Sequence, residues 1–191
     1  MLSGADPSVA DGQGLTAMHY ASVYGSMELN STLIEHGPAG LVFSEAPGGE
    51  TSLFVACHRG HLQIAKALIK AGGEALLLKT TENGCSCLYI ACAMGHLEVA
   101  KALFNASGDS RDAFLLMTDS VHGLSCLHSA CHYGHAAIVA FLLSLSCAGL
   151  VGLRTSCGRT ALDLAVAAGQ TAAAEAIRAA SGRPTPPRRP G

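Results

Sequence analysis

Apolar residues recur at helical spacing along most of the chain, with polar residues between them. Leu62, Ala65 and Ile69 show the pattern clearly, because they fall on one side of a helix while Gln63 and Lys70 fall on the other. Such an apolar stripe predicts an amphipathic helix that packs its apolar side against a neighbour. A shorter apolar segment precedes it in the sequence, and a glycine lies between the two predicted helices.

The same arrangement occurs five times along the chain. Each copy has an alanine in its short apolar segment and a glycine four residues later, and successive alanines are 35, 35, 39 and 35 residues apart. Self-similarity at such a period is typical of a repeat protein, in which every unit buries its apolar side against the next unit. The alanines are Ala21, Ala56, Ala91, Ala130 and Ala165, and the glycines are Gly25, Gly60, Gly95, Gly134 and Gly169.

Local signals place the two ends of the shorter helix in each copy. A hydroxyl residue occurs just before it, where a side-chain oxygen accepts a hydrogen bond from the free amide groups of the first turn. The glycine after the alanine is expected to end the helix, because glycine adopts the left-handed conformation without strain. The predicted N-caps are Thr16, Thr51, Ser86, Ser125 and Thr160.

The five copies resemble the ankyrin repeat, whose signature is T-P-L-H-x-A in a unit of about 33 residues. Residues 16–21 and 125–130 come closest, with the sequences TAMHYA and SCLHSA. No copy keeps the proline, and Phe54, Tyr89 and Asp163 replace the histidine in the other three. The resemblance implies an all-α fold, namely an ankyrin-repeat solenoid of stacked helix-turn-helix units with finger loops between them.

The resemblance also implies a division of the chain. We predict a partial leading repeat over residues 1–10, five repeats over residues 11–182 and a disordered tail rich in proline and arginine over residues 183–191. A chain that begins within a repeat suggests a fragment of a larger protein. The P-x-x-P-x-R arrangement of the tail either binds proline-reading Src-homology domains or occurs by chance. The five repeats are expected at about residues 11–45, 46–80, 81–119, 120–154 and 155–182.

The connector between repeats departs from the usual pattern in two ways. A leucine lies eight residues before each of four turn glycines, so we expect it to add to the core at the junction. The aspartate that the family carries three residues before the turn glycine is kept only as Asp11. The finger loops are therefore expected to differ in shape from those of the family. The connector leucines are Leu41, Leu76, Leu115 and Leu150, and the residues in place of the aspartate are Ala46, Thr81, Ser120 and Thr155.

A polar insertion, NASGDSRD over residues 105–112, lengthens the third repeat. A polar loop on a rigid scaffold is a candidate contact site for a partner. Added loop residues also cost little free energy, so a tolerated insertion without a role is the alternative.

Composition and charge bear on the class of partner. The chain has 191 residues, of which 49% are hydrophobic and 14% charged, and this suits a globular unit with a core. Its formal net charge of -2 gives no general attraction to nucleic acid or anionic lipid, so neither is an expected partner. The uncharged residues 136–153 include serines, glycines and a predicted repeat helix, so no membrane span is expected. Since no secretion signal is recognised, we expect a cytoplasmic or nuclear location.

The eight cysteines and nine histidines raise the question of metal binding. Cys57 with His61, and Cys131 with His135, have an i, i+4 spacing that would suit a chelate. Equivalent residues of stacked helices lie roughly 8 to 10 Å apart, whereas zinc needs four ligands at about 2.0 to 2.3 Å. The same separation is too long for disulfides between equivalent cysteines, so we expect buried, reduced thiols.

A histidine follows the helix-ending glycine in three copies, as His61, His96 and His135. Recurrence at one repeat position favours a repeated structural hydrogen bond over a catalytic base. No acidic residue recurs beside these histidines to orient a base, and no glycine-rich phosphate loop opens a helix after a strand. We therefore expect no enzyme activity and no cofactor, with a metal or redox module as a further alternative.

The resemblance implies that a partner protein binds to a concave face, which the finger tips and the outer side of the first helices form. Tyr24, Arg59, Met94 and Tyr133 share one repeat position, so they are expected to form a row along this face. The chain is expected to be a monomeric scaffold for an unidentified protein; the alternative is a targeting or regulatory segment of a larger enzyme or signalling protein. The predicted partner-binding residues are Gln13, Tyr24, Glu50, His58, Arg59, Asn83, Met94, His122, His132, Tyr133 and Arg159.

Overall fold

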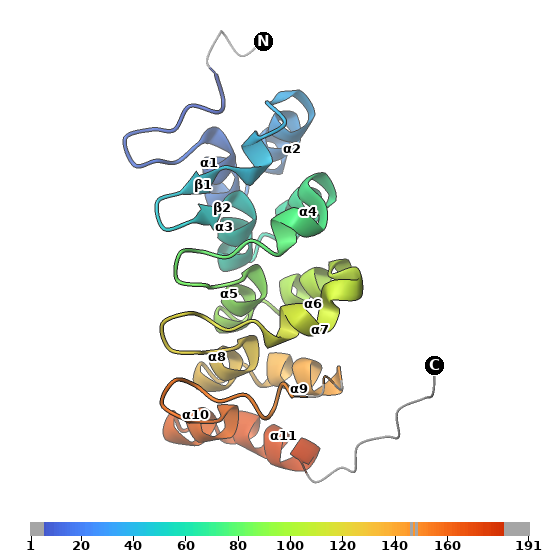
Figure 1. The fold of residues 1–191 in the computed structure, drawn as a ribbon. Coiled ribbons are helices and arrows are strands. Elements are labelled where there is room, and N and C mark those ends of the chain that lie inside the picture. Colours follow the sequence, from blue (N-terminus) through green and yellow to red (C-terminus); the bar gives the residue numbers. More distant parts are fainter. Residues whose placement is uncertain (1–5, 146, 148, 182–191) are drawn as a thin grey trace.

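A computed structural model describes residues 6–145, 147 and 149–181 of the 191-residue chain. Within them, eleven α-helices, two 3-10 helices and two short strands follow one another. The helices form pairs that stack in sequence order from one end of the molecule to the other (Figure 1). The predicted all-α solenoid of helix-turn-helix units is therefore confirmed. The tail over residues 183–191, with its proline motif, and the first half of the predicted leading repeat lie outside the described residues.

The helix pairs form two columns, and the finger loops project from the column of first helices, on the side away from the second helices (Figure 1). The first helices are α1 (Ala17–Tyr24), α3 (Ser52–Arg59), α5 (Cys87–Ala93), α8 (Cys126–His132) and α10 (Ala161–Ala167). The second helices are α2 (Met27–His36), α4 (Leu62–Leu77), α6 (Leu97–Ala106), α9 (Ala136–Ser144) and α11 (Thr171–Ser181). The remaining elements are η1 (Leu41–Phe43), η2 (Gly108–Ser110), α7 (Arg111–Leu116), β1 (Glu45–Ala46) and β2 (Glu50–Thr51).

The ends of the first helices follow the local signals in the sequence. The Thr51 hydroxyl accepts a hydrogen bond from the amide of Phe54 at 3.2 Å, and Ser86 accepts one from the amide of Tyr89 at 3.1 Å. Thr16, Ser125 and Thr160 occupy the same N-cap position of α1, α8 and α10. The predicted N-caps are confirmed. The five glycines after these helices have φ between 71° and 81°, which confirms their predicted left-handed conformation.

Small and large apolar residues divide the core between them. The recurring alanine of each first helix is no more than 1% exposed, and its small side chain lets neighbouring first helices pack closely. The four connector leucines are also no more than 1% exposed, so their predicted place in the core is confirmed. Burial of each such leucine stabilises the fold by about 1.5 to 3 kcal/mol.

The insertion in the third repeat is helical. Residues 105–112 cover the end of α6, all of η2 and the start of α7, and α7 packs against α6. The Arg111 guanidinium lies 4.8 Å from the centre of the Phe104 ring, and Phe114 is only 1% exposed. Phe114 of α7 thus holds the inserted segment against the helix column, and a contact role for residues 105–112 stays a prediction.

In the part of the chain that the structure describes, no helix is long and apolar enough to cross a membrane.

Candidate functional site

The candidate site is the surface formed by the finger loops and the exposed side of the first helices, which we name the finger face. Three backbone hydrogen bonds of 2.8 Å join consecutive loops, each from an amide to a carbonyl of the preceding loop. The second to fifth loops are thus joined in series. The bonded pairs are Glu82 to Gly48, Ser120 to Asn83 and Ser156 to His122, and the loops are residues 11–15, 46–50, 81–85, 119–124 and 155–159.

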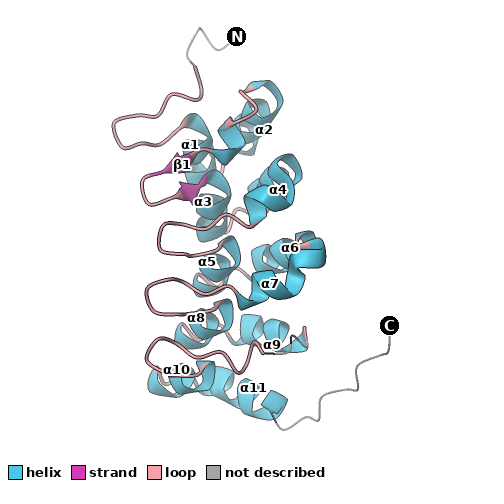
Figure 2. Ribbon diagram, viewed as in Figure 1, coloured by secondary structure: helices cyan, strands magenta, loops and turns pink. Residues whose placement is uncertain are grey.

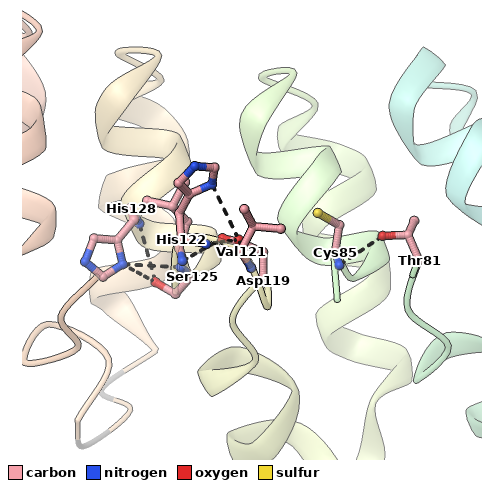
Figure 3. Close-up of polar contacts among 8 residues, drawn as sticks. Thr81, Cys85, Asp119, Val121, His122, Ser125 and His128 are labelled. Atoms are coloured by element: carbon pink, nitrogen blue, oxygen red, sulfur yellow. Dashed lines mark hydrogen bonds and ion pairs between the residues drawn. The ribbon is translucent and has the colours of Figure 1, made fainter. Parts of the chain in front are cut away.

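Asp119 organises the fourth finger loop. Its carboxylate is buried and accepts hydrogen bonds from the amides of Val121, His122 and Leu124, at 2.9, 2.6 and 2.6 Å (Figure 3). We predicted from the sequence that Ser120 replaces the family aspartate, but Asp119, one residue earlier, accepts the loop amides. The difference arises because the fourth finger is one residue longer: its closing bridge joins Thr118 to Ser125, whereas the third bridge joins Thr80 to Ser86.

Shorter polar side chains organise other loops. Thr81 accepts a hydrogen bond from the amide of Cys85 at 3.1 Å (Figure 3), and Thr155 accepts one from the amide of Arg159 at 3.1 Å. Asp11 accepts hydrogen bonds from the amides of Gln13 and Leu15 in the first loop. The second loop is closed by the antiparallel strands β1 and β2 (Figure 2). The loops therefore use different closing groups.

Three histidines tie three of the first helices, α1, α3 and α5, to the repeat that follows each of them. In each case Nε2 lies within 3.4 Å of a backbone carbonyl oxygen in the preceding first helix. A carbonyl oxygen only accepts, so Nε2 carries the hydrogen and donates it. The predicted repeated hydrogen bond is confirmed. The pairs are His61 with Val23 at 3.4 Å, His96 with His58 at 3.1 Å and His135 with Ala93 at 2.9 Å.

Buried thiols meet across two repeat junctions. Cys57 of α3 lies beside Cys87 of α5, and Cys92 of α5 lies beside Cys126 of α8. These contacts were not predicted from the sequence, because the two cysteines of each pair occupy different positions within their repeats. Burial first, and then the adjacent thiol, raises the pKa of Cys57 and Cys92, which keeps them protonated and unreactive. Among the described residues, no three His, Cys, Asp or Glu side chains converge as metal ligands would.

The four residues that were expected to form a row lie at the C-terminal ends of consecutive first helices. Tyr24 and Arg59 are the last residues of α1 and α3, and Met94 and Tyr133 are the C-caps of α5 and α8. All four are exposed, with Tyr24 at 77% and Tyr133 at 54%. Their helices pack in series, α1 on α3, α3 on α5 and α5 on α8. They are therefore available to contact a partner along the repeat stack.

A groove of about 380 Å³ opens on the finger face between the last two finger loops and α8, and we name it the finger groove. Four predicted partner-binding residues line it, namely His122, His132, Tyr133 and Arg159. The other predicted residues lie outside it: Gln13, Tyr24, Glu50, Arg59, Asn83 and Met94 are exposed, and His58 is half-buried. Six further residues line it, namely Tyr89, Leu124, Ser129, Thr155, Cys157 and Leu164, and of these Tyr89, Ser129, Thr155 and Leu164 were not predicted.

Tyr89 is the most informative of the unpredicted lining residues. It takes the place of the signature histidine in the third copy, so that substitution was the signal available in the sequence. Burial raises the pKa of Tyr89 to about 12, and its hydroxyl therefore stays protonated as a hydrogen-bond donor.

Comparison with known families agrees with these features. A family model described as ankyrin repeats matches the chain in three overlapping copies, over residues 1–75, 41–113 and 107–183. A search of curated proteins found no match. The boundaries of the five repeats stay a prediction.

Proposed function

The chain belongs to the ankyrin-repeat family, and from this premise we propose that it is a scaffold that holds a partner protein on its finger face. Members of this family are generally protein–protein interaction modules and are typically not enzymes. The residues proposed to bind the partner are the eleven named from the sequence. A partner in the cytoplasm or nucleus suits a chain with many reduced cysteines, and a monomer leaves the whole face free.

One observation carries this proposal: the finger groove gathers an arginine and exposed aromatic rings on a surface held rigid by bonded loops. Arginine and tyrosine contribute a large share of binding energy at protein interfaces. His132 and Tyr133 also support one another, with their ring centres 4.9 Å apart in an edge-to-face arrangement. A preorganised surface loses little conformational entropy when a partner binds.

The test starts with capture of the partner by the full chain from a lysate, and identification by mass spectrometry. Affinity for that partner is then measured for Arg59→Ala and Tyr133→Ala, after unfolding curves have shown that both variants are folded. Each is expected to lose about 2 kcal/mol or more, or roughly 30-fold in Kd.

Lys70→Ala is the matched control, because Lys70 is exposed on α4, in the column of second helices. It should bind as the parent does. Equal binding by all three variants would exclude the finger face as the site.

A further inference from the structure

The finger groove has an apolar wall that suits one large side chain. Leu164 of α10 is only 8% exposed, and Tyr89 and Leu124 are half-buried in the same wall. Its volume of about 380 Å³ lies at the small end of the range for ligand sites, which is roughly 300 to 1,000 Å³. A leucine or phenylalanine side chain with its adjoining backbone fits such a space.

The titratable residues around this apolar wall include basic residues but no acidic ones. Arg159, His122 and His132 line the groove, and no aspartate or glutamate is among its lining residues. The Arg159 guanidinium donates no hydrogen bond to any residue that the structure describes, so its donors point to solvent. The groove therefore offers an unused cation beside an apolar wall.

Asp119 and Asp163, which interact electrostatically with His122 and Arg159 of the groove, already accept hydrogen bonds from other groups. Asp119 is 6% exposed, accepts three backbone amides and lies 3.8 Å from Nδ1 of His122. Asp163 accepts the amide and the hydroxyl of Thr160, both at 2.8 Å, as part of the N-cap of α10. The positive charge of Arg159 acts on Asp163, but the carboxylate itself is held by Thr160. Neither carboxylate neutralises the groove through a direct bond to the arginine.

We propose that the finger groove binds a short acidic segment of a partner protein, with one leucine-like or aromatic side chain against Leu124 and Leu164 and a carboxylate on Arg159. This inference rests on the proposed function and names the chemistry of its partner. Arginine binds carboxylates through two parallel hydrogen bonds, which fixes orientation as well as adding affinity. A peptide suits the site better than a small molecule, because the groove lies on the exposed finger face and Tyr133, which lines it, is one of the exposed residues at the ends of the stacked first helices.

The probe is a set of synthetic peptide libraries presented to the full chain. Each peptide has a fixed central leucine, and the flanking positions are drawn from Asp, Glu, Ser and Gly in one library and from Lys, Arg, Ser and Gly in the other. The acidic library is expected to be enriched at least about tenfold over the basic one, and binding should weaken as salt is raised.

The selected peptides are then measured against Arg159→Gln and Leu124→Ala, each expected to weaken Kd by about tenfold or more. Lys70→Ala is again the control and should have no effect. A peptide with glycine in place of its leucine should lose at least a similar factor. Thermal unfolding of each variant shows that the groove is intact.

Several results would overturn the proposal. These are equal enrichment of both libraries, binding unchanged by Arg159→Gln, and competition by polyglutamate as strong as that by the leucine peptide. If the partner captured from a lysate still needs Arg59 and Tyr133 while the acidic library is not selected, the scaffold function stands and this inference falls.

Discussion

At the scale of single residues, a few buried polar side chains hold backbone groups that have no other partner. Asp119 accepts three amides of one finger loop, and the buried His128 lies 2.9 Å from the hydroxyl of its N-cap residue Ser125 (Figure 3). The buried His19 lies at the same distance, 2.9 Å, from the hydroxyl of its N-cap residue Thr16. These groups add little hydrophobic burial. Their importance lies in the cost of a buried amide without an acceptor, which is about 1 to 3 kcal/mol.

Replacing Asp119 tests this cost directly. Asp119→Ala is expected to lower the free energy of unfolding by about 2 kcal/mol or more, because three loop amides lose a charged acceptor. Asp109→Ala is the control, since Asp109 is exposed in η2, and it should change stability by less than about 0.5 kcal/mol. Urea unfolding measures both. Equal midpoints for the two variants would show that Asp119 does not organise the loop.

The two buried histidines predict a dependence of stability on pH. Burial lowers the pKa of His19 and of His128 in the folded chain, whereas an unfolded histidine titrates near pH 6.5. Below pH 6.5 the unfolded chain therefore binds more protons than the folded chain, and stability falls as the pH is lowered towards the folded pKa. Their full contribution is present above pH 6.5.

A double variant, His19→Asn with His128→Asn, isolates this contribution. The asparagine oxygen can take the place of Nδ1 as acceptor but does not titrate. We expect the variant to be less stable than the parent at pH 7.5, with the gap in thermal midpoint narrowing between pH 6.5 and 5. A gap that stays constant over this range would contradict the assignment.

At the scale of elements, the junction between consecutive helix pairs combines a glycine with a histidine of the next repeat. A Cβ atom on Gly60 would lie 2.6 Å from the His96 ring, and the φ of Gly60 is +77°. Gly169 occupies the same position of the last described repeat with a φ of +71°, yet a Cβ there would meet nothing within 4 Å. The two glycines therefore share a left-handed backbone conformation, which strains any substitution, but differ in packing.

Gly60→Ala is expected to destabilise the chain by roughly 2 to 4 kcal/mol, from left-handed strain together with displacement of His96 from its hydrogen bond. Gly169→Ala should cost only the strain, about 1 to 2 kcal/mol. In a His96→Ala background the cost of Gly60→Ala should fall, since the clash is gone. Urea unfolding of the four variants gives these values, and an equal cost in both backgrounds would rule out the clash.

At the scale of the whole molecule, each repeat contacts only its neighbours, so stability is a sum over repeats and their junctions. In the described chain α11 packs on α9 and α10, with no helix beyond it, whereas α5 has neighbours on both sides. Loss of packing at the end of a stack is expected to open that end alone, while loss in the middle weakens both sides.

Ile177→Ala and Leu88→Ala test this distinction, since their side chains are 1% and 0% exposed. Hydrogen exchange of Ile177→Ala should accelerate in α10 and α11 but not in α3 and α5. Leu88→Ala should accelerate exchange throughout α3 to α8. Global acceleration by both variants would show that the stack unfolds as a single unit.

The sequence by itself determined the repeat, the N-caps, the helix-ending glycines and the core leucines. These features depend on interactions between residues a few positions apart, or on the spacing of apolar residues. Both can be recognised from the order of residues alone. Tertiary structure decided the role of Asp119, the meeting of Cys57 with Cys87, the packing of the insertion and the finger groove. Each of these joins side chains or loops whose relative placement depends on how one repeat stacks on the next, and a shift of one residue or a different rotamer changes the partner without changing the pattern.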